Sequence, residues 1–238
     1  MVRANETGER VPFTFADWNP EEGWVEFIFM VIGKTTEMLS TYEAGDAIQD
    51  VTGPLGQPTE MGEGNWAVIG GGVGLAIAFP VARQLKATGH EVHAIMGART
   101  KDLLLLEDQF RSVLDDEHIH ITTDDGSYGE KGVVTAPLER LLQEKKVDHV
   151  FCVGPVPMMK FSALTAEKYD TPIIASLNPI MVDGTGMCGG CRVEVGGKTK
   201  FACVDGPEFD GAVVDFAQLS ARQGMYREME AAARAHVC

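Results

Sequence analysis

A glycine-rich segment toward the carboxyl end of the chain contains three of its five cysteines. Cys188 and Cys191 form a Cys-x2-Cys pair, and Cys203 follows after eleven further residues. When Asp183 is counted as a fourth donor, the segment opens as Asp-x4-Cys-x2-Cys. This is the plant-type [2Fe-2S] spacing with a carboxylate in place of the first thiolate. The chain around these donors must fold so that all of them face one small group.

Other interpretations of the cysteines are a structural zinc site, a redox disulfide, or three unrelated buried thiols. Structural zinc loops usually have two paired Cys or His knuckles, and this segment has one pair. The intervening glycines give the loop the unusual dihedral angles that turn thiolates inward. We therefore expect a [2Fe-2S] cluster on Asp183, Cys188, Cys191 and Cys203, although an Asp followed by Gly also suits an ordinary turn.

Charge and length exclude several classes of protein. The 238 residues include 20 Lys and Arg against 35 Asp and Glu, a net charge of -15 that repels nucleic acids and anionic membranes. The longest apolar run, residues 66–82, contains four glycines and is short for a membrane span. The first residues lack the basic and apolar regions of an export signal. We expect a cytoplasmic protein with no nucleic-acid or membrane partner, whose thiols bind metal.

Residues 65–175 alternate between apolar strands and helices. Strands are expected at 66–69, 91–96, 119–123 and 148–153, and helices at 75–85, 103–113 and 138–145. Thr100 is placed to cap the second helix, with Asp102 in its first turn. This alternation predicts a doubly wound parallel sheet that binds its ligand at the carboxyl ends of the strands.

The residues that follow these strands are typical of a dinucleotide site. Glycines after the first strand allow a phosphate to approach the backbone at a helix start. The second strand ends without the usual ribose-binding acid, and Asp125 after the third strand is our substitute. Arg99 could instead bind a 2'-phosphate, which leaves NAD and NADP both open. The expected cofactor-binding residues of this edge are Gly70, Gly71, Gly72, Gly74, Arg99, Asp125, Gly154 and Pro155.

Residues 1–60 contain short alternating segments at 11–15, 24–31 and 46–51, which predict antiparallel strands of a small sheet or barrel. A short helix is expected at 33–39 with Thr35 near its amino-terminal cap. Three stretches, 10–14, 31–36 and 53–56, resemble the flavin-binding barrel of the ferredoxin-NADP reductase superfamily. The resemblance implies flavin contacts from Arg10, Pro12, Phe13, Thr14, Gly33, Lys34, Thr35 and Thr36. Family members usually carry several dozen residues before this arginine strand, so the barrel is expected to be short at its amino end.

Gly154-Pro155 with Met158 and Met159 resembles the Cys-Gly-Pro-x-x-Met signature of the same superfamily, whose Cys lies beside the nicotinamide. Val153 stands at that position here. Cys152, one step earlier in the strand, is expected to face the other side of the sheet as a packed thiol. No histidine shows ligand spacing, and none is assigned chemistry: His90, His93, His118, His120, His149 and His236.

The last part of the chain is expected to form a hairpin at 192–195 and 198–202 that returns Cys203 to the loop, a rim segment at 204–210, and an amphipathic helix from 212 onward. Residues 183–192 and 201–210 resemble the family of small subunits of electron-bifurcating NADH-dependent ferredoxin:NADP oxidoreductases, also described as sulfide dehydrogenase small subunits. The electron-transfer subunit of dihydroorotate dehydrogenase has the same layout but normally four cysteines, so Asp183 favours the first family.

The sequence thus predicts an α/β chain in three parts: a partial FAD-binding antiparallel β-barrel (1–60), a doubly wound parallel NAD-binding sheet (61–175), and a [2Fe-2S] loop module with a terminal helix (176–238). The resemblance implies that NAD(H) exchanges a hydride with FAD, and FAD exchanges single electrons with the cluster. It also implies a heterodimer or higher complex with a larger flavin and iron-sulfur subunit that handles NADP(H) and ferredoxin. Alternatives are the dihydroorotate or sulfide dehydrogenase role, or a non-catalytic nucleotide-sensing module with a zinc loop.

Overall fold

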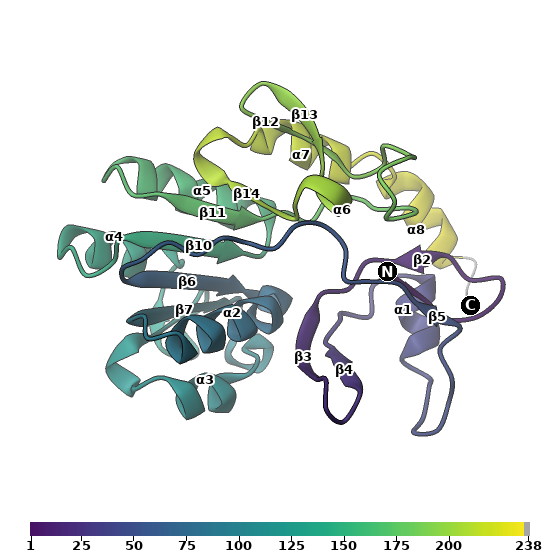
Figure 1. Ribbon diagram of the computed structural model, residues 1–238, viewed down its shortest axis with the longest axis horizontal. Coiled ribbons are helices and arrows are strands. Elements are labelled where there is room, and N and C mark those ends of the chain that lie inside the picture. Colours follow the sequence, from purple (N-terminus) through teal and green to yellow (C-terminus); the bar gives the residue numbers. More distant parts are fainter. Residues whose placement is uncertain (236–238) are drawn as a thin grey trace.

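A seven-stranded sheet forms the centre of the structure, a computed structural model that describes residues 1–235 (Figure 1). Its strand order is β14-β11-β10-β6-β7-β8-β9, and all neighbours are parallel except β14, which runs antiparallel to β11. The strands are β6 (Trp66–Gly71), β7 (Val92–Ala98), β8 (Ile119–Thr123), β9 (Glu130–Lys131), β10 (His149–Val153), β11 (Ile173–Ser176) and β14 (Glu208–Asp210).

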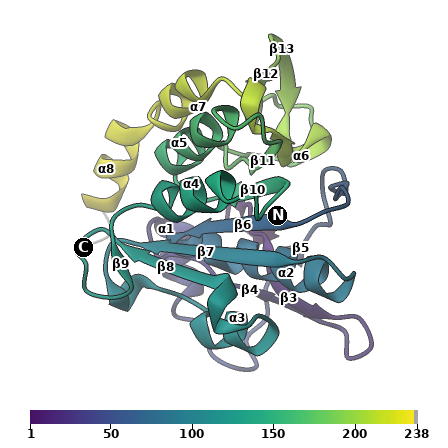
Figure 2. The same cartoon turned by 90° about the vertical axis from the view of Figure 1, so that its left-hand side faces the viewer.

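Both faces of this sheet are buried, as its continuously apolar strands predict. Ala67 and Ile69 of β6 pack on one side in a cluster with α4, α5 and α7, whereas Trp66 and Val68 pack on the other with α2 and α3. Figure 2 shows these two helical layers. Truncating a side chain as buried as Ile69 to alanine typically costs about 2–5 kcal/mol. The helices are α2 (Leu75–Ala87), α3 (Glu107–Val113), α4 (Thr135–Gln143), α5 (Val156–Glu167) and α7 (Phe216–Gln223).

The chain order of the strands reverses between β6 and β10. From β6 the sheet grows through β7 and β8 in one direction and through β10 and β11 in the other. Ligands of open α/β sheets bind in the crevice at such a switch point. The end of β6 with its turn, at Gly70–Gly74, and the turn after β10, at Gly154–Pro155, lie at this switch point.

The helix expected at 103–113 begins later than predicted, and Thr100 does not cap it. Thr100 precedes a single 3-10 turn, η2 (Lys101–Leu103), and its side chain makes no capping hydrogen bond. Leu106, with a left-handed φ of 60°, then precedes α3. Leu104 and Leu106 are partly buried against the core. The run of four leucines has no helical period, so packing against the sheet decided its path.

Residues 1–60 form two small antiparallel sheets in agreement with a partial barrel, and Figure 1 shows them beside the central sheet. The expected strand at 24–31 ends at Phe27, and that at 46–51 is limited to its last two residues. Met30, Val31 and Ile32 are half exposed, because no strand pairs with them in the described part of the chain. The elements are β1 (Val2–Arg3), β2 (Arg10–Val11), β3 (Phe15–Asn19), β4 (Trp24–Phe27), α1 (Lys34–Leu39) and β5 (Asp50–Val51).

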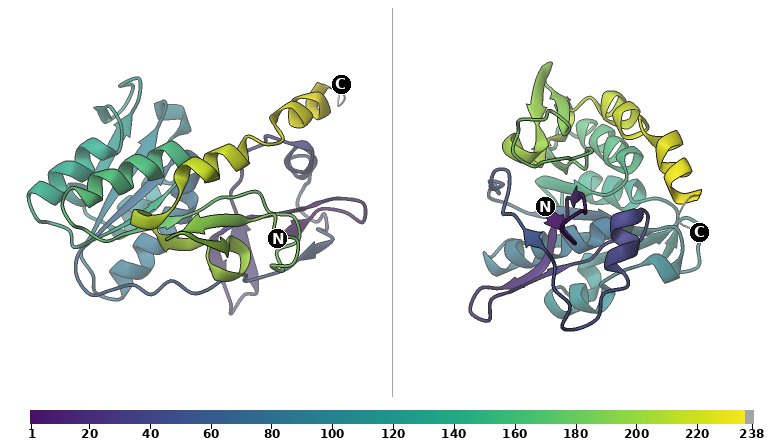
Figure 3. Two further views of the ribbon diagram at one scale, coloured as in Figure 1. Left: turned by 90° about the horizontal axis from the view of Figure 1, so that it is seen from above. Right: turned by 90° about the vertical axis from the view of Figure 1, so that its right-hand side faces the viewer.

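The carboxyl-terminal part contains the expected hairpin, but its other elements differ. The expected rim segment contains the end of helix α6 and the edge strand β14 of the central sheet. In place of the single expected helix there are two helices, α7 and α8, separated by a turn that begins at Gly224. Helix α8 extends beyond α7 (Figure 3). None of the described helices has the length and hydrophobicity needed to cross a membrane. The elements are β12 (Arg192–Val195), β13 (Lys198–Phe201), α6 (Ala202–Asp205), η4 (Gly211–Val213) and α8 (Arg227–Ala235).

Candidate iron-sulfur and nucleotide sites

The hairpin of β12 and β13 brings the distant cysteine back to the loop. Cys191 lies directly before β12 and Cys203 in helix α6, directly after β13. Their sulfur atoms lie 3.2 Å apart, and both residues are buried. Cys188, the third cysteine of the expected set, is exposed. The expected return of Cys203 to the loop is therefore confirmed, and one side of the site faces solvent.

The donor groups of this loop suit an iron-sulfur cluster. The carboxylate of Asp183 accepts a 2.8 Å hydrogen bond from Thr185 N–H, which keeps the pKa of Asp183 below its usual value. Burial, followed by the neighbouring Cys191 thiol, raises the pKa of Cys203 to about 11. A bound metal ion would replace that proton, because coordinating thiols are deprotonated. Three sulfurs and one ionised carboxylate are thus available in this loop, and their role as the four ligands stays a prediction.

Backbone N–H groups also point at the thiols. The N–H of Gly190 donates to Cys188 Sγ at 3.3 Å, and the N–H of Cys203 donates to Cys191 Sγ at 3.5 Å. Hydrogen bonds to cluster sulfurs are a principal means by which proteins set cluster potential. Gly186 is required by the turn itself, since it has a φ of 82° and a Cβ there would lie 2.6 Å from Val204.

The loop packs directly on residues 1–60. A Cβ on Gly184 would lie 2.7 Å from Met1 Cγ and 2.8 Å from Leu55 Cδ1. Farther along, Gln57 N–H donates to the carbonyl of Gly206 at 2.7 Å. The part of the chain expected to bind flavin is therefore in contact with the part that carries the cysteines.

The two glycine turns of the nucleotide edge also touch each other. A Cβ on Gly74 would lie 2.5 Å from the carbonyl oxygen of Val153 and 3.0 Å from Gly154 Cα. A Cβ on Gly71 would meet the side chains of Pro155 and Met158. These glycines allow the turns after β6 and β10 to approach closely, so the structure brings together the predicted residues on both sides of the switch point.

Arg99 and Asp125 meet at the same edge through their backbones. The N–H of Asp125 donates to the carbonyl of Arg99 at 3.3 Å, and both side chains are exposed. The Asp125 carboxylate accepts from Ser127 N–H at 2.9 Å, and Ser127 lowers its pKa. An ionised acceptor and a cation are thus available beside the crevice, and their roles toward a nucleotide stay predictions.

The expected flavin-binding residues lie on residues 1–60 in two groups. Arg10 and Arg3 occupy paired positions on β2 and β1, and both approach Asp50, at 3.5 and 2.8 Å respectively. The Phe13 ring stacks on Phe29 with centroids 5.0 Å apart. Pro12 and Thr14 are exposed. Asp50, which holds Arg10, gave no signal in the sequence because it acts only through strand pairing.

The second group, Gly33 to Thr36, lies at the start of α1. The expected cap at Thr35 is wrong, because Gly33 is the cap residue. The Thr36 hydroxyl accepts from the N–H groups of Ile32 and Gly33 at 3.0 Å and donates to Gly33 O at 2.8 Å. This hydroxyl closes the turn, whereas Lys34 is exposed.

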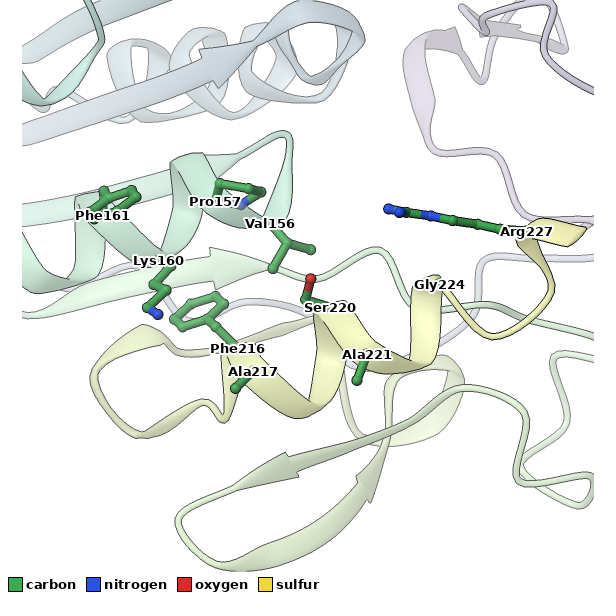
Figure 4. Close-up of a pocket in the computed structure, with 10 residues that line it drawn as sticks. All are labelled: Val156, Pro157, Lys160, Phe161, Phe216, Ala217, Ser220, Ala221, Gly224 and Arg227. Atoms are coloured by element: carbon green, nitrogen blue, oxygen red, sulfur yellow. The ribbon is translucent and has the colours of Figure 1, made fainter.

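Cys152 is the packed thiol that the register predicted. It is fully buried on the α5 side of the sheet, Val153 is in the cluster of the opposite side, and burial raises the pKa of Cys152 to about 12. An open groove on the outside of this layer, between α5 and α7, contains none of the expected cofactor or metal residues (Figure 4). It is lined by Val156, Pro157, Lys160, Phe161, Phe216, Ala217, Ser220, Ala221, Gly224 and Arg227.

Although no histidine shows ligand spacing along the chain, the fold brings two of them together. His93 and His118, far apart in the sequence, lie together with Glu91 in an arrangement that could hold a metal ion. The sequence does place His93 near the start of one expected strand and His118 directly before the next, which was the available signal. His236 lies outside the described residues.

The fold and these sites define an NAD(H)-dependent oxidoreductase subunit with a flavin-reductase fold and an iron-sulfur loop. Residues 178–215 match the family described as the iron-sulfur cluster binding domain of dihydroorotate dehydrogenase B, and residues 68–163 match the oxidoreductase NAD-binding domain. The expectation of an iron-sulfur cluster and NAD(H) is thereby confirmed, and that of FAD agrees with the fold.

The similar proteins identify the family. An electron transfer subunit homologue of dihydroorotate dehydrogenase B from Thermotoga maritima is 51% identical over 97% of this chain and 81% of that protein. The corresponding subunit of Streptococcus mutans is 33% identical over 84% of this chain and 78% of its own length. The chain belongs to the family of dihydroorotate dehydrogenase B electron transfer subunits and their homologues.

Solved structures agree with this assignment. The structure of an NADH-dependent reduced ferredoxin-NADP oxidoreductase, described for flavin-based electron bifurcation, has a TM-score of 0.91 and 49% identity, covering 99% of this chain and 85% of that one. The cytochrome b5 reductase domain of Ulva prolifera nitrate reductase has a TM-score of 0.56 and 22% identity, covering 71% of this chain and 78% of its own, and shares the fold.

Proposed function

We propose that this chain passes electrons between NAD(H) and a larger iron-sulfur flavoprotein, as the electron-transfer subunit of an NADH-dependent ferredoxin:NADP oxidoreductase that carries out flavin-based electron bifurcation. One observation carries the proposal: the cysteine loop packs on Met1 and Leu55 of the flavin-binding region. That region in turn contacts the nucleotide sheet through β3 and α2. The three parts of the chain that are expected to hold the cofactors are therefore in contact with one another.

The nucleotide edge binds NAD(H). The contact between Gly74 and Gly154 supports a crevice in which backbone atoms, rather than side chains, approach the dinucleotide. Asp125 accepts hydrogen bonds from the ribose, and Arg99 neutralises phosphate charge. Cys152 takes no part, because it is buried on the α5 side of the sheet.

Residues 1–60 hold FAD. Arg10, kept in place by Asp50, and the exposed Thr14 face the flavin and its phosphates with Pro12 and Phe13. The loop of Gly33, Lys34 and Thr35 contributes backbone N–H groups and one cation, while Thr36 maintains the turn. FAD supplies hydride exchange with the nicotinamide and single-electron exchange with the cluster, so the protein provides position rather than an acid or base.

The four loop donors divide into two pairs. The short distance between the sulfurs of Cys191 and Cys203 supports their sharing one iron. The Asp183 carboxylate and the Cys188 thiol lie beside each other, and after the Thr185 N–H their contact is a further cause of the lowered pKa of Asp183. This pair would hold the second iron of a cluster bound in this loop.

The exposed side of the loop faces the partner. Val182, which directly precedes Asp183, is 58% exposed, and Met187, which directly precedes Cys188, is 87% exposed. Exposed apolar side chains around a functional group mark an interaction surface. A partner that covers them brings its own redox group near the iron held by Asp183 and Cys188.

Anaerobic visible spectra with iron, flavin and zinc analysis test the proposal on the full chain, before and after NADH. We expect flavin bands over a charge-transfer background, about two irons per chain, and bleaching by NADH. Cys191→Ser should lose iron and keep flavin, whereas Cys152→Ala, which removes a buried sulfur elsewhere, should retain both. A colourless protein with stoichiometric zinc in the cysteine loop would contradict the proposal and favour a nucleotide-sensing module.

The relatives from Streptococcus mutans and Thermotoga maritima make the dihydroorotate dehydrogenase role the second candidate. Co-purification of the natural complex separates the two roles. A large subunit that reduces NADP and ferredoxin supports the first, and one that oxidises dihydroorotate, or one that acts on sulfide, supports the alternatives.

A further inference from the structure

Three side chains converge where strands β7 and β8 begin. Glu91 directly precedes β7, His93 is the second residue of β7, and His118 ends the 3-10 turn η3 (Asp116–His118) that leads into β8. A carboxylate oxygen of Glu91 lies 3.5 Å from His93 Nε2 and 3.7 Å from His118 Nε2. The nucleotide edge is formed by the carboxyl ends of the same strands, so this cluster lies at the opposite edge of the sheet.

His93 is the central residue of this cluster. It is 4% exposed, and its Nε2 has no hydrogen-bond partner among the described residues. Its Nδ1 lies 3.2 Å from Nε2 of His120.

A neutral imidazole carries one proton for its two nitrogens. In the tautomer that donates from Nδ1 to His120, the buried Nε2 presents a lone pair to the Glu91 carboxylate. Two electron-rich atoms then face each other across 3.5 Å, an arrangement that a metal ion bound between them would stabilise. The unpartnered Nε2 is thus oriented as a metal ligand.

The distances fit a small tetrahedral ion. Zinc bonds to nitrogen and oxygen of about 2.0–2.1 Å place neighbouring ligand atoms about 3.3 Å apart. The two measured distances from Glu91 are slightly longer than this, and all three ligand atoms lie within 4.8 Å of one another. Two imidazoles and one carboxylate are a common zinc donor set, and the half-exposed Glu91 leaves a fourth position for water.

The surroundings also orient the ligands. Metal-bound histidines usually donate their other N–H to a neighbouring acceptor. His120 is positioned to accept from His93. Among the described residues Nδ1 of His118 has no hydrogen-bond partner, and a Glu117 carboxylate oxygen lies 4.0 Å from it. We propose that Glu91, His93 and His118 bind a zinc ion that ties the start of β7 to the turn before β8.

Zinc uptake by the complete protein, with flavin and cluster in place, tests this site. Chelator-treated protein is supplied with zinc sulfate, passed through a gel-filtration column, and analysed for zinc and iron. We expect about one zinc ion per chain without loss of iron. Zinc K-edge absorption should show only nitrogen and oxygen neighbours, and zinc should raise the melting temperature.

His118→Gln and Glu91→Gln change the less buried ligands and should weaken zinc binding at least about 100-fold while the flavin and cluster remain. Glu144→Gln, which removes an exposed carboxylate paired with Lys146, is the matched control and should bind zinc normally. The proposal is overturned if the unaltered protein retains no zinc, if zinc has sulfur neighbours, or if both variants bind zinc as tightly as the control.

Discussion

Arg83 of helix α2 donates a 2.7 Å hydrogen bond to the carboxylate of Asp17 on strand β3. The same guanidinium lies over the rings of Trp18 and Phe79, at 5.5 and 5.4 Å from their centroids. This contact joins residues 1–60, the proposed flavin-binding region, to the central sheet. The Arg83 hydrogen bond is the main reason that the pKa of Asp17 is below its usual value.

Asp17→Asn is therefore expected to lower the free energy of unfolding at pH 7 by about 0.2–1 kcal/mol, since both partners are about one-third exposed and screened by water. A carboxyl whose folded pKa is lowered stabilises the protein above its unfolded pKa of about 3.9. That contribution is lost as the pH falls through the lowered folded value. Urea unfolding of both proteins at pH 7 and near pH 3 tests this pH dependence. A loss of stability in Asp17→Asn that is equal at the two pH values would contradict it.

Asp183 should be required for the cluster as a ligand and not only as a turn residue. Asp183→Ala is expected to weaken iron retention at least about tenfold, whereas Asp183→Cys should keep iron and change the electron paramagnetic resonance spectrum of the reduced protein. Asp210→Ala, which removes the acceptor of Ala212 N–H, is the control and should keep both. If both Asp183 variants keep the full iron content and an unchanged spectrum, Asp183 is not a ligand of the cluster.

Gly74→Ala should disturb the nucleotide crevice, because the added Cβ would lie 2.5 Å from the backbone oxygen of Val153. We expect a loss of about 1–3 kcal/mol in the free energy of unfolding and a higher KM for NADH. Gly33 has extended backbone and open space around it. Gly33→Ala should therefore change stability by no more than about 0.5 kcal/mol, and equal losses in both variants would argue against the close contact.

Asp125→Ala should raise the KM for NADH about tenfold if its carboxylate binds the ribose. Asp124→Ala removes the adjacent exposed acid and serves as the control. Steady-state reduction of a dye by NADH measures both variants. Equal KM values for the two variants would mean that another group at this edge binds the ribose.

Met187→Glu should weaken the complex with the large subunit without changing flavin or iron content. Met187 is 87% exposed beside the cluster loop, and a charge there opposes burial against a partner. Met229, on α8 and 70% exposed, provides the matched control Met229→Glu. Co-purification yields are the measurement, and equal yields for the two variants would place the interface elsewhere.

Local pattern was sufficient for much of the fold. The alternation of apolar strands and helices predicted the parallel sheet, and cysteine spacing predicted the iron-sulfur loop. The pattern failed at Leu103 to Leu106, where four leucines carry no period, and at Trp24 to Val31, where a strand-like sequence lacks a neighbour to pair with along its full length. Both errors have one cause, because local preference yields to packing and pairing with distant residues.

Sequence alone predicted which groups carry chemistry, from the spacing of Cys188 and Cys191, the glycines after the first strand, and the arginine strand at Arg10. Tertiary structure decided what these groups meet. It paired Cys203 with Cys191, held Arg10 against Asp50, and joined Glu91, His93 and His118 from separate strand starts. Spacing along a chain reports contacts within one loop or helix, whereas contacts between strands depend on their order and register in the sheet, which only the folded core establishes.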